Sequence, residues 1–200
     1  MILYTLNRIR KYYFILIELF CSFIQKVDLN IKSIKYGKNC KFIGYTTFYK
    51  TAHSQITISE KCTFNSTTEW NLLGCNKRCI ISTLTPNACI QIGSGCGFSG
   101  VTIGAFNCIK IGNQCIIGAN VTITDSDWHP IHPNNRHNGD IKTSPVIIGD
   151  NVFIGANSII LKGSIIGKNS VIGAGSVVSG NIPENTIAAG NPCKIIRKIE

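Results

Sequence analysis

One segment of the chain gathers the side chains best suited to proton transfer. Residues 124–146 hold three of the four histidines, and two acidic residues stand just before the first of them: His129, His132, His137, Asp125 and Asp127. Histidine exchanges protons near neutral pH and also binds metal ions, and a carboxylate can orient an imidazole and stabilise its protonated form. The segment therefore suits acid–base catalysis or metal ligation. Its chemistry depends on the elements that hold it in place.

The sequence after this segment has a period of six residues. Its large aliphatic positions are Ile148, Ile154, Ile160, Ile166, Ile172 and Val178. Glycine follows four of them, at Gly149, Gly155, Gly167 and Gly173, and a small or β-branched residue recurs at Val152, Ser158, Ser164, Ser170 and Ser176. A period of six fits neither a helix nor a half-buried strand, so it indicates a repeating unit. We expect a short strand and a tight turn per unit, with the aliphatic side chain inward and the glycine supplying a turn conformation that other residues resist.

The same period recurs upstream. Its triplets are Tyr36, Phe42 and Phe48, then Ile58, Phe64 and Trp70, then Ile111, Ile117 and Ile123. Between residues 75 and 110 the period slips, which predicts bulged coils. After Ile123 it breaks and resumes only at Ile148, and this interval is not a multiple of six. We therefore expect one inserted loop at 124–146, and long excursions from a rigid repeat are usually functional.

The ten cysteines raise the question of disulfides or a zinc site. Four of them occupy the small-residue position of a unit: Cys40, Cys62, Cys96 and Cys115. The sequence also lacks a C-x-x-C pair, which is the usual zinc-binding spacing. We therefore expect free, buried thiols that pack as small hydrophobic groups, as suits a reducing cytosol.

Residues 1–35 lack the six-residue period. Residues 12–24 are almost wholly apolar, include Glu18 and follow a basic stretch, but they are too few to span a bilayer, which takes about 20 residues. Two interpretations stay open. A helix here could cap the exposed strand edges of the repeat, or it could lie on the inner membrane face with peripheral contact through residues 8–25. We favour the cap, and one helix could serve both purposes.

The formal net charge is +10. The basic residues are scattered and do not form the cluster of basic and aromatic residues that nucleic-acid binding requires, so we expect no nucleic-acid partner. A polyanionic small molecule makes better use of this charge.

Three features together resemble the hexapeptide-repeat acetyltransferases, closest to the galactoside, maltose, nodulation and capsular-polysaccharide O-acetyltransferases. They are the hexads, the DWHP segment and the ending NIPENTIAAGNPCKIIRKIE. The resemblance implies an all-β fold, a left-handed parallel β-helix with three hexads per coil. At that repeat length the chain would wind about eight coils. We assign residues 36–190 to this β-helix with its inserted loop 124–146, residues 1–35 to a short helical segment and residues 191–200 to a C-terminal tail.

The resemblance also implies roles for residues of the inserted loop. The catalytic base of those enzymes is the first histidine of the H-P-x-H/D stretch, which matches His129 here. Asp125 or Asp127 would orient it, and the sequence does not decide between them. Trp128, His132 and Arg136 would contact the substrate, although Trp128 could equally anchor the loop. His132 and His137 also resemble part of the metal site of the γ-class carbonic anhydrases, but that class takes its ligands from strands, so we expect no metal.

The coenzyme site follows from the same resemblance. The matching positions are Gly155, Ala156, Ala174, Gly190, Pro192, Lys194 and Arg197. The resemblance further implies a cytoplasmic homotrimer with active sites between subunits. Its activity would be the transfer of an acetyl group from acetyl-CoA to a sugar hydroxyl in surface-polysaccharide assembly. The alternatives are an N-acetyltransferase acting on an amino-sugar nucleotide and a non-catalytic β-helix scaffold.

Overall fold

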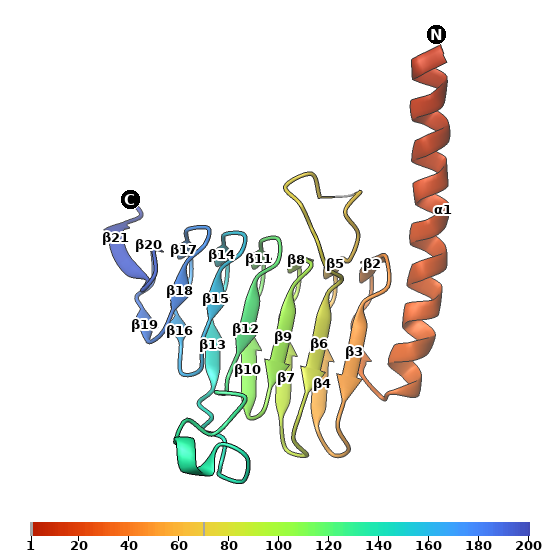
Figure 1. Cartoon of the computed structure of the whole chain (residues 1–200). Helices are drawn as coiled ribbons and strands as arrows, with labels where there is room; N and C mark the ends of the chain where they lie inside the picture. The colour runs from red at the N-terminus through yellow and green to blue at the C-terminus, as the bar shows by residue number, and fades with distance from the viewer. Residues whose placement is uncertain (1, 70) are drawn as a thin grey trace.

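The chain beyond residue 34 winds into a left-handed parallel β-helix whose coils stack along one axis (Figure 1). The computed structural model describes residues 2–69 and 71–200, and for residues 2–7 and 10 it describes the backbone alone. Each coil contributes one strand to each of three sheets, so the predicted fold class is confirmed. Trp70, which we expected to point inward, lies outside the described residues.

The three sheets form the sides of a triangular prism. Sheet A contains β1 (Lys35–Tyr36), β4 (Gln55–Ile58), β7 (Cys89–Ile92), β10 (Cys108–Ile111), β13 (Val146–Ile148), β16 (Ile165–Ile166) and β19 (Asn181–Ile182). Sheet B contains β2 (Lys41–Ile43), β5 (Thr63–Asn65), β8 (Gly97–Ser99), β11 (Ile116–Ile117), β14 (Phe153–Ile154), β17 (Val171–Ile172), β20 (Thr186–Ala189) and β21 (Lys194–Lys198). Sheet C contains β3 (Thr47–Lys50), β6 (Ile80–Thr83), β9 (Thr102–Ala105), β12 (Thr122–Thr124), β15 (Ile159–Ile160) and β18 (Val177–Val178).

The inward positions of the hexads form the core. The six predicted residues from Ile148 to Val178 are all buried, and facing strands keep them in register, as Ile154 with Ile172. At the N-terminal end the column inside sheet B is aromatic. Phe42, Phe64 and Phe98 stack with ring centroids 5.3 and 4.9 Å apart. Each coil thus buries apolar surface that it could not bury alone, which makes the core continuous.

The small-residue position of each hexad accepts either serine or cysteine for one physical reason. The side chain is buried at the turn and donates a hydrogen bond to a backbone carbonyl. Ser170 Oγ donates to Pro183 O (2.7 Å), and Cys115 Sγ donates to Gly149 O (3.1 Å). The four predicted slot cysteines are buried and free.

The expected role of the repeat glycines is wrong. None of Gly149, Gly155, Gly167 and Gly173 has a positive φ. They are glycine because a Cβ would collide with the next coil; at Gly149 it would lie 2.7 Å from Lys168 N. The left-handed turn conformation falls two residues later, on asparagine in three of these units and on Gly175 in the fourth. Asparagine tolerates that conformation better than most residues.

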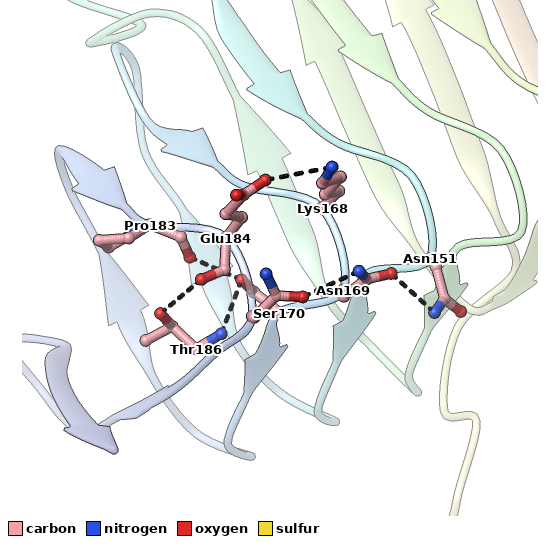
Figure 2. Close-up of polar contacts among 8 residues, drawn as sticks. Asn151, Lys168, Asn169, Ser170, Pro183, Glu184 and Thr186 are labelled. Carbon is pink, nitrogen blue, oxygen red and sulfur yellow. Dashed lines mark hydrogen bonds and ion pairs between the residues drawn. The ribbon is translucent and has the colours of Figure 1, made fainter. Parts of the chain in front are cut away.

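The turn asparagines also stack between coils. Asn151, Asn169 and Asn185 have φ values of 54°, 59° and 53°. Asn151 Nδ2 donates to Asn169 Oδ1 (3.1 Å), and Asn169 Nδ2 donates to Asn185 Oδ1 (2.9 Å), which forms the ladder seen in Figure 2. The corner between sheets A and B is therefore the most regular of the three, with four connecting residues in every one of the six full coils.

The other two corners absorb the irregularities of the sequence. The described chain completes six full coils and part of a seventh, fewer than the expected eight, because two excursions consume residues. Residues 125–145 leave the corner between sheets C and A, and residues 66–79 leave the corner between sheets B and C. The slip between residues 75 and 110 lies in turns of unequal length at these corners, since the paired strands there contain no bulge.

One pair of cysteines departs from the expectation of free thiols. Cys89 and Cys108 form a disulfide, with Cα atoms 4.6 Å apart. The two residues are directly opposed on the parallel strands β7 and β10, so the coil spacing itself brings their side chains together. The remaining eight cysteines are free.

Helix α1 (Ile2–Ile31) closes the N-terminal end of the β-helix and is longer than the short segment that we expected. Gln25 Oε1 accepts a hydrogen bond from Thr46 N (2.8 Å), and Leu29 joins the core. The N-terminal half extends beyond the coils (Figure 1). No helix among the described residues is both long and apolar enough to cross a bilayer. At the other end, the C-terminal tail contains β21, which pairs antiparallel with β20.

Candidate active site

The loop of residues 125–145, hereafter the histidine loop, has a paired neck that fixes it to the coil. Ser126 and Thr143 form an antiparallel bridge, Asp127 N donates to Lys142 O (3.1 Å), and Ser144 N donates to Asp125 O (2.9 Å). The loop projects from the C–A corner (Figure 1). Its first residues are therefore positioned by the rigid repeat, whereas its tip lies away from the coils.

Asp125 attaches the neck to the preceding coil. Its carboxylate is fully buried and accepts hydrogen bonds from Phe106 N (2.7 Å) and Asn107 N (2.8 Å), one on each oxygen. Burial raises the pKa of this carboxyl group, and the backbone donors oppose that rise. Because both oxygens are used by the backbone, Asp125 serves the attachment of the loop and makes no hydrogen bond to His129 in the described structure.

Asp127 pairs with a cation from the next coil. One carboxylate oxygen forms an ion pair with Lys162 Nζ, and Lys162 lies in the turn that follows β15. The other oxygen, Oδ2, is buried and has no hydrogen-bond partner in the described part of the chain. A buried acceptor without a partner is costly, so this oxygen is available to a donor that approaches it.

Trp128 anchors the start of the loop against sheet C. Its indole Nε1 donates to Thr124 Oγ1 (2.8 Å), and its ring meets that of Phe106 edge-on at 5.5 Å. The ring also covers Gly104, where a Cβ would come within 2.8 Å of Trp128 Cζ2. These contacts support the anchoring role, and the side chain remains 42% exposed. His129 follows directly and is exposed to solvent.

The other predicted site residues of the histidine loop lie at its tip, where His132 and Arg136 make hydrogen bonds within the loop. His132 Nδ1 accepts from Asn134 N (3.3 Å) and caps the 3₁₀ turn η1 (Pro133–Asn135), while Arg136 Nη2 donates to Ile131 O (3.2 Å). His137 is exposed. Within the described residues, no three His, Cys, Asp or Glu side chains come together as a metal site requires.

The predicted coenzyme residues lie along one corner of the prism. Ala156, Ala174 and Gly190 fall in successive turns after β14, β17 and β20, all at the B–C corner. Gly155 precedes Ala156, and Ala156 lines a groove of about 370 Å³ with Gly118 and Phe153. We call this row of turns the B–C ridge. It presents backbone and small side chains, which allow a narrow chain to approach closely.

The tail supplies the basic part of this candidate site. Pro192 stands in the turn between β20 and β21, and Lys194 and Arg197 lie on β21 with exposed side chains. Strand β21 pairs with β20, so both cations sit beside the end of the B–C ridge.

The structure does not bring the histidine loop and the B–C ridge together at one corner. The loop leaves the C–A corner, the ridge follows the B–C corner, and sheet C separates the two within one chain.

The sequence did not predict a second excursion from the coil. Residues 66–79 leave the B–C corner, where Asn120 Nδ2 donates to Gly74 O (2.9 Å) and Asn120 Oδ1 accepts from Asn76 N (3.2 Å). Leu73 lines the same groove as Ala156. The sequence signal for this excursion is the interval from Phe64 to Ile81, the next buried residue of the repeat, because this interval is not a multiple of six. Trp70 stands six residues after Phe64, so the six-residue spacing continues to that position.

Comparison with known proteins agrees with this architecture. Residues 145–179 match the family model for the hexapeptide repeat of succinyl-transferase. Over 91 residues the chain is 47% identical to galactoside O-acetyltransferase from Escherichia coli (strain K12), which covers 46% of this chain and 44% of that protein. The galactoside O-acetyltransferase of Lactococcus lactis subsp. lactis (strain IL1403) is 50% identical over 91 residues, with the same coverage. The matched region thus spans less than half the length of these curated relatives.

Solved structures with the same fold extend the comparison. A polysialic acid O-acetyltransferase superposes with a TM-score of 0.62 at 26% identity, covering 82% of this chain and 74% of that one. A galactoside acetyltransferase in complex with coenzyme A superposes with a TM-score of 0.53 at 29% identity, covering 83% of this chain and 65% of that one. In its repeat, its coil and these matches, the chain is similar to the hexapeptide-repeat proteins, the group that includes the matched acetyltransferases.

Proposed function

We propose that this protein is an acetyl-CoA-dependent O-acetyltransferase that modifies a sugar hydroxyl. The observation that carries the proposal is the similarity to galactoside O-acetyltransferases over 91 residues at 47% identity. An exposed His129 held at the base of an anchored loop is consistent with that activity.

His129 is the proposed general base. Its imidazole takes the proton of the acceptor hydroxyl as the hydroxyl oxygen bonds to the acetyl carbonyl carbon. The bond from that carbon to the coenzyme A sulfur breaks, and the sulfur receives the proton from the imidazole. Charge and protons balance without a covalent acyl-enzyme, so none of the cysteines acts as a nucleophile.

Asp127 is the proposed orienting carboxylate for His129. Its Oδ2 atom is buried and without a hydrogen-bond partner in the described residues, two positions before His129 in the chain. An imidazole N–H that reached this oxygen would satisfy it and would stabilise the protonated ring. The ion pair with Lys162 holds the carboxylate in place.

Acetyl-CoA is the proposed acetyl donor, bound along the B–C ridge. The ridge offers the exposed turn residues Ala174 and Gly190 and the groove beside Ala156 to the pantetheine arm. The exposed Lys194 and Arg197 are the proposed partners of its phosphates, because cations and phosphate oxygens form strong charge-assisted hydrogen bonds.

Because the ridge and the histidine loop lie at different corners, we propose a homotrimer in which the ridge of one subunit faces the loop of its neighbour. Sedimentation of a fully active monomer at assay concentration would rule out this arrangement.

For the acceptor we propose a carbohydrate of a cytoplasmically assembled surface polysaccharide. Trp128, His132 and Arg136 lie in the loop that would border it, and the similarity in fold to a polysialic acid O-acetyltransferase supports this class.

The test compares His129→Ala with His137→Ala, since both histidines are exposed in the same loop. The assay follows the release of coenzyme A thiol with galactosides and oligosaccharides as acceptors, and a thermal melt checks each fold. We expect His129→Ala to lower kcat at least about a hundredfold, the usual cost of losing a general base, and His137→Ala to leave it nearly unchanged. Near-normal turnover by a folded His129→Ala protein would refute the assignment. Mass spectrometry of the product, before and after mild alkali, separates an acetyl ester from an amide.

A further inference from the structure

Helix α1 turns a polar face toward the β-helix. Ser22 Oγ donates to Phe42 O (3.2 Å), and Gln25 Oε1 accepts from Thr46 N (2.8 Å). These contacts satisfy backbone groups of the first coil that would otherwise form an open strand edge. Among the helix side chains that the structure describes, Leu29 is the only fully buried apolar one.

The opposite face of α1 is an exposed apolar stripe. Its central residues follow one another at intervals of four and three: Ile9, Tyr13, Leu16, Phe20, Phe23 and Val27. Because a helix turns 100° per residue, this spacing places all six on one side, away from Ser22 and Gln25. Tyr12, Leu19 and Ile24 widen the stripe, and each is also exposed. The stripe is about 27 Å long at 1.5 Å per residue.

Two kinds of occupant fit a stripe of this shape. Intervals of four and three are the pattern of a coiled-coil seam, so a second copy of α1 could cover it. An amphipathic helix of this kind can also lie in the headgroup region of a bilayer with its apolar side down. The charges around the stripe discriminate between the two.

The N-terminal end of the molecule is strongly basic. Residues 1–61 contain ten of the twenty Lys and Arg residues but only three of the ten Asp and Glu residues. Arg8, Lys11 and Lys26 on the helix are exposed, as are Lys35 and other lysines of the first coil. Two copies joined through α1 would bring these like charges together, whereas anionic headgroups would complement them.

We propose that α1 docks this protein on an anionic phospholipid surface, with the apolar stripe in the interface and the β-helix standing on the membrane. Tyr12 and Tyr13 suit this position because their amphipathic rings favour the headgroup level. The proposal is independent of the acetyl transfer. It would place the enzyme where a lipid-linked acceptor is presented.

The test uses the full chain and sedimentation with two kinds of vesicle. One contains phosphatidylglycerol and phosphatidylethanolamine in equal parts, and the other contains phosphatidylcholine alone. The test variant is Phe20→Glu with Phe23→Glu. The matched control is Ile147→Glu with Ile165→Glu, which adds the same charge at two exposed apolar residues of strands β13 and β16 in sheet A, far from the helix in sequence.

We expect the native protein to bind the anionic vesicles at least tenfold more strongly than the neutral ones, and high salt to weaken that binding. The Phe20→Glu, Phe23→Glu protein should lose at least tenfold in binding, and the control should retain it, with both melting near the native temperature. Two results with the vesicles would overturn the proposal: no binding of vesicles by the native protein, or equal binding by the two double variants. A third result would also overturn it: the native protein forms an oligomer that binds no lipid and that dissociates in the Phe20→Glu, Phe23→Glu protein. The last result would assign the stripe to a second copy.

Discussion

The repeat glycines offer the sharpest test of how the coils stack. We predict that Gly149→Ala destabilises the protein because the added Cβ would lie 2.7 Å from Lys168 N, whereas ordinary contact begins at 3.4 Å. The two turns must separate by roughly 0.7 Å, and the neighbour is backbone that no rotamer change can move. The same turns share the hydrogen bond from Gly149 N to Ile166 O at 2.8 Å, which this separation would weaken.

The expected magnitude follows from two opposing effects. Overpacking a tight site costs about 1–3 kcal/mol, and replacing glycine by alanine recovers about 0.4–1 kcal/mol by restricting the unfolded chain. The difference between the midpoints of these ranges is a net loss of about 1.3 kcal/mol. For a chain of this size each kcal/mol shifts Tm by about 2–4 °C, so Tm should fall by about 3–5 °C. Circular dichroism melts under reducing and non-reducing conditions measure this directly.

Two control glycines separate crowding from backbone conformation. At Gly97 a Cβ meets nothing within 4 Å and φ is not positive, so Gly97→Ala should leave Tm unchanged or slightly raised. At Gly175 the space is also open but φ is +69°, so Gly175→Ala should cost about 1–2 kcal/mol through backbone strain alone. If Gly149→Ala melts with the native protein, or Gly97→Ala loses as much stability, close stacking of turns is not the reason for the glycines.

Two further predictions concern the ion pair of the histidine loop and a buried thiol. Lys162→Met removes the partner of Asp127 and should lower kcat at least about tenfold with little change in KM for acetyl-CoA, whereas Lys168→Met, which breaks an exposed ion pair, should leave steady-state kinetics unchanged. Burial raises the pKa of the Cys79 thiol to about 11 from 9.0, so the unfolded chain loses this proton first as the pH rises. The free energy of unfolding should therefore decrease between pH 9 and 11 by up to about 1.4 kcal/mol per pH unit, and urea titrations should give a flatter profile for Cys79→Ala.

The sequence predicted the scaffold because the period of the side chains is the period of the coil. Each inward position from Ile148 to Val178 needed only the spacing to be identified, and all are buried. The role predicted for the repeat glycines was wrong because two different requirements select glycine: a left-handed turn conformation and close approach of the backbone of the next coil. Only the backbone angles, with asparagine at positive φ, distinguish the two.

Long-range pairings were beyond the sequence. Cys89 and Cys108 form a disulfide because they are directly opposed on neighbouring strands. Predicting this pairing requires the length of the coil between them, and that length differs from the eighteen residues of three hexads. Similarly, the pairing of Asp127 with Lys162 joins two consecutive coils across the loop. The resemblance to the hexapeptide-repeat acetyltransferases predicted His129 as the base and left Asp125 and Asp127 as alternatives. The hydrogen bonds from Phe106 and Asn107 to Asp125 became visible only in the fold.

The two excursions from the coil differ in a way that bears on assembly. The histidine loop is largely polar, and it is fixed to the preceding coil by Asp125 and to its own coil by Trp128. The excursion 66–79 instead presents Leu72, 98% exposed, and Leu73 beside the groove of the B–C ridge. Adjacent exposed leucines at the rim of an apolar groove are unfavourable in an isolated chain and become favourable when another surface covers them. A neighbouring subunit at this corner would bury them and would bring its own histidine loop toward the ridge, so the same contact would serve stability and complete the proposed site.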